Sequence, residues 1–194
     1  MTYTDEQLLN RVIEIGGKIE HDKHLIIGVQ RKEQDFNKFT DKFYHFLGDK
    51  FQSVVHGTTI AGKNALLTFD KGGNAAGAAV WKTDEFYEDL YSYGLHKGKM
   101  PCLRQVAPIK YYRDNDKDEI AEQQGELHTG IIYANFHGCS YTYDPDTDHN
   151  IVKTNVGGWS YGCQVVADMD KYEKIIEAVK AHPLKANYAL LMEF

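Results

Sequence analysis

Residues 39 to 59 carry the pattern of a β-hairpin. Between residues 39 and 47, large side chains occur at odd and at even positions alike. Because successive side chains of a strand point to opposite faces, such a strand must have both faces occupied. Gly48-Asp-Lys forms a turn, and residues 51 to 59 then read as the returning strand. The chain is therefore expected to build its core around a covered β-sheet.

The composition favours a β-rich fold of ordinary domain size. The 194 residues include thirteen Tyr, nine Phe and seventeen Gly but only four Pro. Hydrophobic residues make up 42% and charged residues 26%, which argues against disorder. No repeat or linker divides the chain, so we expect an N-terminal helical segment over residues 1 to 24 and a single domain over residues 25 to 194.

Hydrophobic periodicity predicts mainly β structure (α+β) with one helix near each end. A helix is expected from residue 4 to 20, capped by Thr4 or Asp5, and a second around residues 169 to 179, capped by Asp168. Strands are expected at residues 25–29, 103–112 with a break at Pro108, 130–137, 164–167 and 187–194. The rest is expected to be loop around a short strand at 66–69, a short helix or irregular segment at 84–93, a turn at 94–98 and a charged loop at 113–126.

Charge and cysteine content narrow the class of protein. The formal net charge of −6 argues against nucleic-acid binding, which needs a basic face. The three cysteines are Cys102, Cys139 and Cys163, and no C-x-x-C spacing supports a zinc ribbon or a thioredoxin-like motif. Cys163 is interpreted as a free thiol. A disulfide between Cys102 and Cys139 stays open.

The N-terminus gives no sign of a targeting segment. Residues 1 to 7 are polar, with no basic region followed by an apolar one, and no stretch has the length of a transmembrane helix. We therefore expect a soluble protein without membrane insertion. If it acts in the periplasm or at the cell wall, it is expected to be delivered there by other means.

Two short motifs carry the chemistry. Phe136-His-Gly138 ends one apolar run, and Trp159-Ser-Tyr-Gly-Cys163 ends another. A thiol placed just after a Ser-x-Gly turn, with a histidine at the end of a nearby strand, is how a cysteine nucleophile is built, because imidazole generates or stabilises the reactive thiolate. The alternative is that Cys163 is a small buried hydrophobic residue and His137 a structural histidine.

In these two motifs the chain resembles the L,D-transpeptidase catalytic domain, whose pattern is His-Gly followed at a distance by Ser-x-Gly-Cys. The resemblance implies a β-sandwich-like fold, no cofactor, and action on peptidoglycan stem peptides through a thioester. It also implies Cys163 as nucleophile, His137 as base, and Ser160 and Gly162 as residues that shape the turn. The sequence departs from the family at Val165, where an Arg is usual, and in a longer segment between the motifs.

A cysteine nucleophile needs other groups besides the thiol and the imidazole. A third group must orient the imidazole of His137, and a backbone carbonyl near Gly157 or Gly158 is the candidate. Gly162 permits a tight turn with positive φ. The amide of Cys163 and a neighbouring amide would hold the oxyanion, each such donor contributing about 3 kcal/mol to transition-state stabilisation.

Substrate-binding residues are expected at the cysteine turn and in a separate turn at residues 94 to 98. Trp159, Tyr161 and Gly158 adjoin the nucleophile. His96 and Lys97 lie between two glycines in a turn whose positive charge suits a substrate carboxylate, although an exposed turn without such a role explains them as well.

No metal site is predicted. Residues 144 to 150 and the set Asp114, Asp116 and Asp118 have the alternating acids of a calcium loop. Both lack the glycine at the sixth place and the glutamate at the twelfth, and polar turns explain both.

The sequence thus predicts a bacterial or phage cysteine enzyme of the L,D-transpeptidase type. Whether water or an amine resolves the acyl-enzyme is left open, and so is the oligomeric state. Two alternatives stay beside it: a catalytically silent cell-wall-binding module, and a cysteine peptidase or amidase of other specificity.

Overall fold

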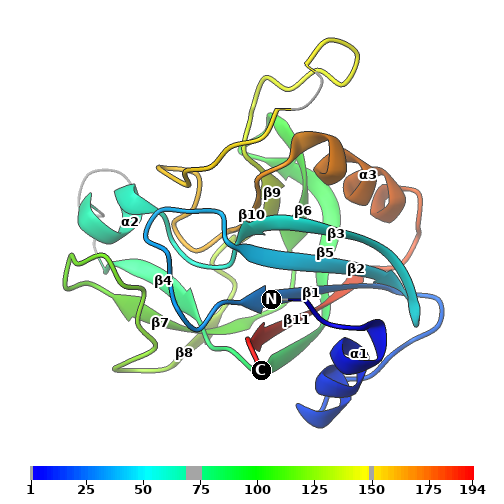
Figure 1. Ribbon diagram of the computed structural model, residues 1–194, viewed down its shortest axis with the longest axis horizontal. Coiled ribbons are helices and arrows are strands. Elements are labelled where there is room, and N and C mark those ends of the chain that lie inside the picture. The colour runs from blue at the N-terminus through cyan, green and yellow to red at the C-terminus, as the bar shows by residue number, and fades with distance from the viewer. Residues whose placement is uncertain (1, 69–75, 149–150) are drawn as a thin grey trace.

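The computed structural model describes residues 2–68, 76–148 and 151–194. Its centre is a closed barrel with the strand order β1-β11-β5-β6-β9-β10-β3-β2 (Figure 1). These strands are β1 (His24–Gln30), β2 (Asp41–Leu47), β3 (Lys50–Thr58), β5 (Glu85–His96), β6 (Met100–Gln105), β9 (Phe136–Gly138), β10 (Gln164–Val166) and β11 (Ala186–Met192). A small sheet beside the barrel has the order β4-β7-β8, formed by β4 (Ala78–Trp81), β7 (Ile109–Asp114) and β8 (His128–Gly130). The mainly-β expectation is confirmed, and the sheets take the form of a barrel with an added sheet.

The hairpin predicted from residues 39 to 59 is confirmed. Strands β2 and β3 pair antiparallel from Asp41↔Gly57 to Leu47↔Lys50, around a turn in which Gly48 has φ of 60°. Strand β1 then pairs antiparallel with β2 and parallel with β11. The barrel is therefore closed by the first and last strands of the chain.

Helix α1 (Asp5–Glu14) covers one part of the barrel. Its N-cap is Thr4, whose side chain and that of Gln7 form a capping box. Leu8 and Val12 are fully buried against β1, β2 and β11. The helix was expected to reach residue 20 but ends at Glu14, because Gly16 takes a φ of 86° that an ordinary helical residue does not adopt.

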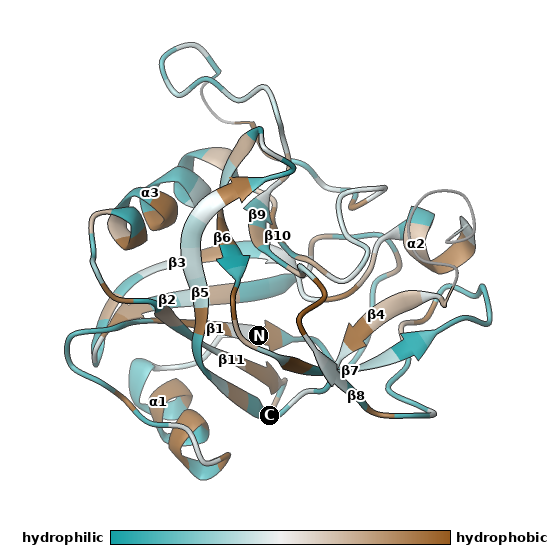
Figure 2. Cartoon of the chain, turned by 180° about the vertical axis from the view of Figure 1, so that it is seen from behind, coloured by the Kyte–Doolittle hydropathy of each residue, from teal (hydrophilic) through white to brown (hydrophobic). Residues whose placement is uncertain are grey.

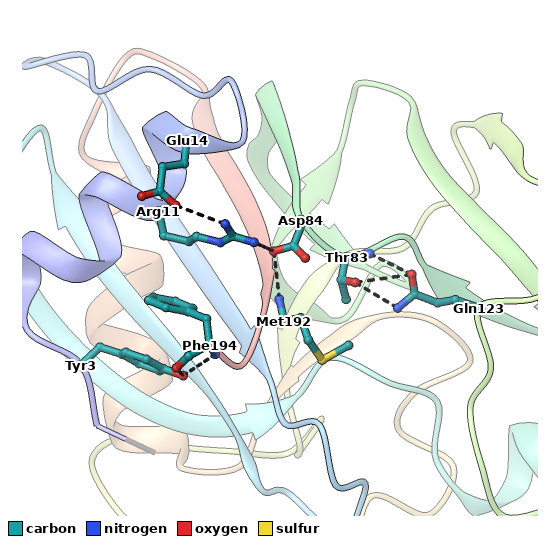
Figure 3. A network of polar contacts seen from close by, with 8 residues as sticks. All are labelled: Tyr3, Arg11, Glu14, Thr83, Asp84, Gln123, Met192 and Phe194. Atoms are coloured by element: carbon teal, nitrogen blue, oxygen red, sulfur yellow. Dashed lines mark hydrogen bonds and ion pairs between the residues drawn. The ribbon is translucent and has the colours of Figure 1, made fainter.

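Polar contacts hold α1 to the end of the chain (Figure 3). Arg11 donates to Asp84 at 3.1 Å, and the amide of Met192 donates to the same carboxylate at 3.4 Å. The hydroxyl of Tyr3 exchanges hydrogen bonds with the backbone of Phe194 at 2.9 and 3.0 Å. The N-terminal helix and the last strand are therefore fastened together.

Helix α3 (Met169–Lys180) is confirmed with its cap, since Asp168 accepts a hydrogen bond from Lys171 N at 3.1 Å. Its buried stripe is the predicted one, formed by Met169, Tyr172, Ile175, Ile176 and Val179. Figure 2 shows hydrophobic and hydrophilic residues interspersed along α1 and α3, as expected of helices with one buried face. None of the described helices has both the length and the apolar character that crossing a membrane requires.

Two local predictions were wrong. The strand expected at residues 66–69 is helix α2 (Lys63–Thr68), and residue 69 lies outside the described residues. Only Ala65 and Leu66 of α2 are buried, so this apolar run has one covered side and does not need a sheet. The helix or irregular segment expected at 84–93 is strand β5, whose Tyr87, Leu90 and Tyr91 are buried. A break in the β5–β11 register interrupts the alternation of buried and exposed residues that would have predicted a strand from the sequence.

Three further predictions differ from the structure. The turn at 94–98 is shorter than expected, since β5 continues to His96 and the turn centres on Lys97 and Gly98. Strand β4 was missed inside the segment read as loop. The strand at 130–137 divides into β8 and β9, with residues 131 to 135 irregular between them. The break at Pro108 is confirmed: it sends β6 into the barrel and β7 into the small sheet.

Candidate active site

Strand pairing brings the two motifs together. Strands β9 and β10 run parallel, with Gln164 opposite Phe136 and Val165 opposite His137. Cys163 stands immediately before β10, and His96 ends β5. The sulfur of Cys163 and one ring nitrogen each of His96 and His137 all lie within 4.8 Å of one another.

The ring of His137 has one nitrogen engaged and the other open. Nδ1 lies 2.7 Å from the carbonyl oxygen of Gly138, so Nδ1 carries the proton and donates it. Nε2 is buried and has no hydrogen-bond partner among the described residues, which leaves its lone pair available. The orienting carbonyl was expected near Gly157 or Gly158. That expectation was wrong, because the next residue of the same strand already supplies one.

His96 stacks on His137, with ring centroids 4.1 Å apart. The Asn135 side chain fixes its tautomer. Asn135 Oδ1 accepts from Gln105 N at 3.0 Å, so Asn135 Nδ2 faces His96 Nδ1 at 3.1 Å and donates to it. The proton of His96 is therefore on Nε2.

Burial keeps the site neutral at rest. Desolvation, with a smaller effect from His96, lowers the pKa of His137 to about 3. Desolvation also lowers the pKa of His96 to about 4, so this ring is not the cationic group expected from the sequence. It raises the pKa of Cys163 to about 11, although the residue as a whole is half-buried. The resting pair is a thiol and a neutral imidazole, and the thiol proton must move during attack.

The turn that carries Cys163 is held from several directions. The Ser160 hydroxyl donates to Cys163 O at 2.8 Å and accepts from Gly162 N at 3.2 Å. Gly162 has φ of 128°, and its carbonyl accepts from the indole of Trp81 at 2.7 Å. Sequence reasoning missed Trp81, because only the pairing of β4 into the small sheet brings it beneath the turn.

Gly162 cannot accept a side chain without cost. A Cβ there would lie 2.7 Å from the Cβ of Ala79, at a φ that L-residues rarely adopt. Gly162→Ala is expected to lower the free energy of unfolding by about 1–3 kcal/mol and to displace Cys163. Urea unfolding of both proteins measures the first effect. Gly16→Ala is the matched control, since Gly16 has positive φ but open space, so an equal loss in both variants would contradict the crowding argument.

A cleft of about 450 Å³ opens above Cys163. Every residue expected to bind substrate lines it, namely His96, Lys97, Gly158, Trp159 and Tyr161. Arg113, at the end of β7, also lines the cleft and was missed in a segment read as charged loop. Lys97 and Arg113 give the cleft two cations, while Ile131 and Tyr133 add exposed apolar surface at 47% and 67% exposure.

The segment between β8 and β9 reaches the sulfur. Tyr133 has φ of 59°, a conformation uncommon for an aromatic residue, and its carbonyl oxygen lies 3.9 Å from Cys163 Sγ. The resting thiol can point its proton at this carbonyl. An incoming substrate would have to turn it toward His137.

The same three atoms, the Cys163 sulfur and one ring nitrogen each of His96 and His137, are close enough together to bind a metal ion, as in open zinc sites. The donor set fits poorly. The lone pair of His96 Nδ1 is taken by Asn135, and its other nitrogen carries the proton. Binding a metal through His96 would break the Asn135 contact or remove that proton, so the resting arrangement of these three side chains does not suit a metal ion.

The remaining cysteines are free and buried, with no disulfide between Cys102 and Cys139. Cys139 Sγ donates to Ala167 O at 3.1 Å. Val165, which stands where the resembled family has Arg, is fully buried in the barrel core. A guanidinium at that position would have to replace core packing.

Comparison of the chain with protein-family models, with curated proteins and with solved structures finds no match.

Proposed function

We propose that the protein is a cysteine acyl-transfer enzyme of the L,D-transpeptidase type that acts on peptidoglycan stem peptides. The proposal rests on two observations: a ring nitrogen of His137 lies within 4.8 Å of the Cys163 sulfur, which lines a cleft, and His137 Nε2 has no hydrogen-bond partner among the described residues. A buried basic nitrogen left without a donor is unusual in a structural histidine, because such groups are ordinarily paired.

The proposed chemistry has two stages. Cys163 Sγ attacks the substrate carbonyl carbon while His137 Nε2 takes the thiol proton, giving a tetrahedral intermediate. The C–N bond then breaks, the imidazolium returns the proton to the leaving amine, and a thioester forms. Water or an amine next attacks the thioester and restores the thiol. The amide of Cys163 is the proposed oxyanion donor.

The cleft suits a substrate rich in carboxylates. Lys97 and Arg113 both line it, and stem peptides carry several carboxylates. We propose that Arg113 supplies from β7 the positive charge that the resembled family carries at the position of Val165. Under this proposal the fold is that family's fold, and the protein, from a bacterium or a phage, acts at the cell wall or in the periplasm.

The proposal is tested with a purified disaccharide–tetrapeptide. We expect release or exchange of the terminal D-Ala and, by intact mass, a thioester adduct on Cys163. Cys163→Ala should form neither, while Cys139→Ala, which alters a buried thiol elsewhere, should keep both if it folds. We expect a carbapenem to label Cys163 alone. Turnover by Cys163→Ala at the parent rate would end the proposal.

One observation favours a second candidate. The raised pKa of Cys163 is what a catalytically silent wall-binding module would show, because its thiol needs no activation. Such a module would bind the same muropeptide in a calorimetric titration but form no product. An ordinary cysteine peptidase would cleave L-peptides instead, so a panel of both substrates separates the three.

A further inference from the structure

Three carboxylates gather where β7 ends and the chain leads toward β8. Asp114 is the last residue of β7, and Asp116 and Glu122 follow it. Oxygen atoms of Asp114, Asp116 and Glu122 all lie within 4.8 Å of one another. They line a cleft of about 410 Å³. None of these residues takes part in the proposed acyl transfer.

Two of the oxygens are buried and unsatisfied. Asp114 is only 4% exposed, and its Oδ1 has no hydrogen-bond partner among the described residues. The same holds for Glu122 Oε2. The other oxygen of Asp114 accepts from the backbone amide of Glu122 at 3.2 Å. A buried carboxylate oxygen without a partner is costly, so a cation bound at this pair would relieve a cost that remains in the free protein.

The local charges point to a cation. Asp118 adds a fourth carboxylate to the same turn, and the cluster is self-repulsive. The guanidinium of Arg113 lines both this cleft and the one above Cys163. Its hydrogen bond to Gly77 O, at 3.1 Å, and its contact with the Tyr111 ring, 4.9 Å from the centroid, are not with the carboxylates.

Hydrogen bonds hold residues 116 to 121 in place before any ligand binds. Asp118 N donates to Asp116 Oδ1 at 3.3 Å, and Ile120 N donates to Asp118 Oδ1 at 2.7 Å. Further along, Ala121 exchanges hydrogen bonds with Gln34, at 2.8 and 2.9 Å. The carboxylates therefore need little ordering before they bind a ligand.

We propose that Asp114, Asp116 and Glu122 bind one Ca²⁺ ion, with Asp118 close enough to contribute. Oxygen-only ligands select hard cations, and a site with several protein carboxylates favours Ca²⁺, because Mg²⁺ keeps several waters and binds through only one or two carboxylates. From the sequence, no metal was expected here, because a calcium loop that starts at Asp114 would lack the glycine at its sixth place and the glutamate at its twelfth. The fold supplies a carboxylate in another way. Glu122, the ninth residue counted from Asp114, brings its carboxylate close to those of Asp114 and Asp116.

The ion would brace the wall of the cleft above Cys163. Asp114 pairs with Ala78 across β4 and β7, and the neighbouring Ala79 and Arg113 line that cleft. The cation site is nevertheless separate from the thiol, so the two proposals stand or fall independently.

The test uses the full chain after treatment with a chelator and dialysis. Addition of CaCl₂ to about 5 mM, above the 10⁻⁴–10⁻³ M range typical of extracellular calcium modules, is expected to raise Tm by about 3–6 °C. Calorimetric titration should give one site per chain. MgCl₂ at the same concentration should give a clearly smaller shift, and an equal shift would overturn the assignment to calcium.

Variants locate the site. Asp116→Asn combined with Glu122→Gln is expected to abolish the Tm response to CaCl₂ while leaving the calcium-free Tm equal or higher, since like charges are removed. Asp146→Asn, in the other run of alternating acids, should keep the full response. A parent protein whose Tm does not respond to CaCl₂, or a double variant that responds like the parent, overturns the proposal.

Discussion

Replacing His137 with Asn is expected to slow acylation of Cys163 by about 10³-fold, within the range that a positioned general base contributes. The side-chain nitrogen of Asn can take over the hydrogen bond to Gly138 O that His137 Nδ1 makes at 2.7 Å. It has no equivalent of the open Nε2, which is the atom proposed to receive the thiol proton. Because the pKa of Cys163 is raised to about 11, almost no thiolate exists near pH 7 without that base.

The measurement is single-turnover thioester formation, followed by intact mass. The chain offers a matched control in His56, which is also followed by glycine but lies exposed on β3. His56→Asn should acylate at the parent rate. If His137→Asn acylates within tenfold of the parent, His137 is not the base, and another group must take the thiol proton.

The parts of the fold that sequence predicted are those set by local pattern. The β2–β3 hairpin needs only alternation and a Gly48 turn, and α3 needs only its stripe and the Asp168 cap. The predictions for residues 84–93 and 130–137 were wrong because the structure of these segments depends on the strands with which they pair. The buried aromatic side of β5 is defined by β11 and β6, which are distant in the sequence.

The same distinction holds for the site. Both motifs were recognisable by residue type, but their meeting depends on the parallel pairing of β9 with β10, which no local pattern reveals. The tautomer of His96 depends on Asn135 and, through it, on the Gln105 amide, so it follows from a relay of contacts between three segments. Trp81 and Arg113 enter the site only through the small sheet.

Acidification to about pH 5 is expected to destabilise the protein strongly, because it buries several neutral histidines. Burial lowers the pKa of His45 and of His137 to about 3, and that of His96 to about 4. All three are at most 8% exposed. Between the unfolded pKa near 6.5 and these folded values, the unfolded chain binds protons that the native state does not. The free energy of unfolding must therefore fall as pH drops below about 6.5.

At pH 5 each of these histidines is expected to cost about 2 kcal/mol relative to pH 7.5, since one pKa unit corresponds to about 1.4 kcal/mol. Two buried acids act in the opposite direction. Burial raises the pKa of Asp41, and raises that of Asp114 to about 6, so their protonation in acid favours the native state. The histidine loss is the larger effect, and it is comparable with the whole stability of many domains. Urea unfolding at the two pH values measures it.

His45 tests the cause, because it lies away from the candidate site, with its Nε2 2.8 Å from His24 Nδ1. His45→Gln is expected to reduce the loss between pH 7.5 and pH 5 by about 2 kcal/mol, whatever it does to stability at pH 7.5. His21→Gln, which alters an exposed histidine, should leave the difference unchanged. The compared quantity is the difference in unfolding free energy between the two pH values, and lost packing at position 45 lowers the stability equally at both. An equal fall in the parent and in His45→Gln would show that the acid sensitivity originates elsewhere.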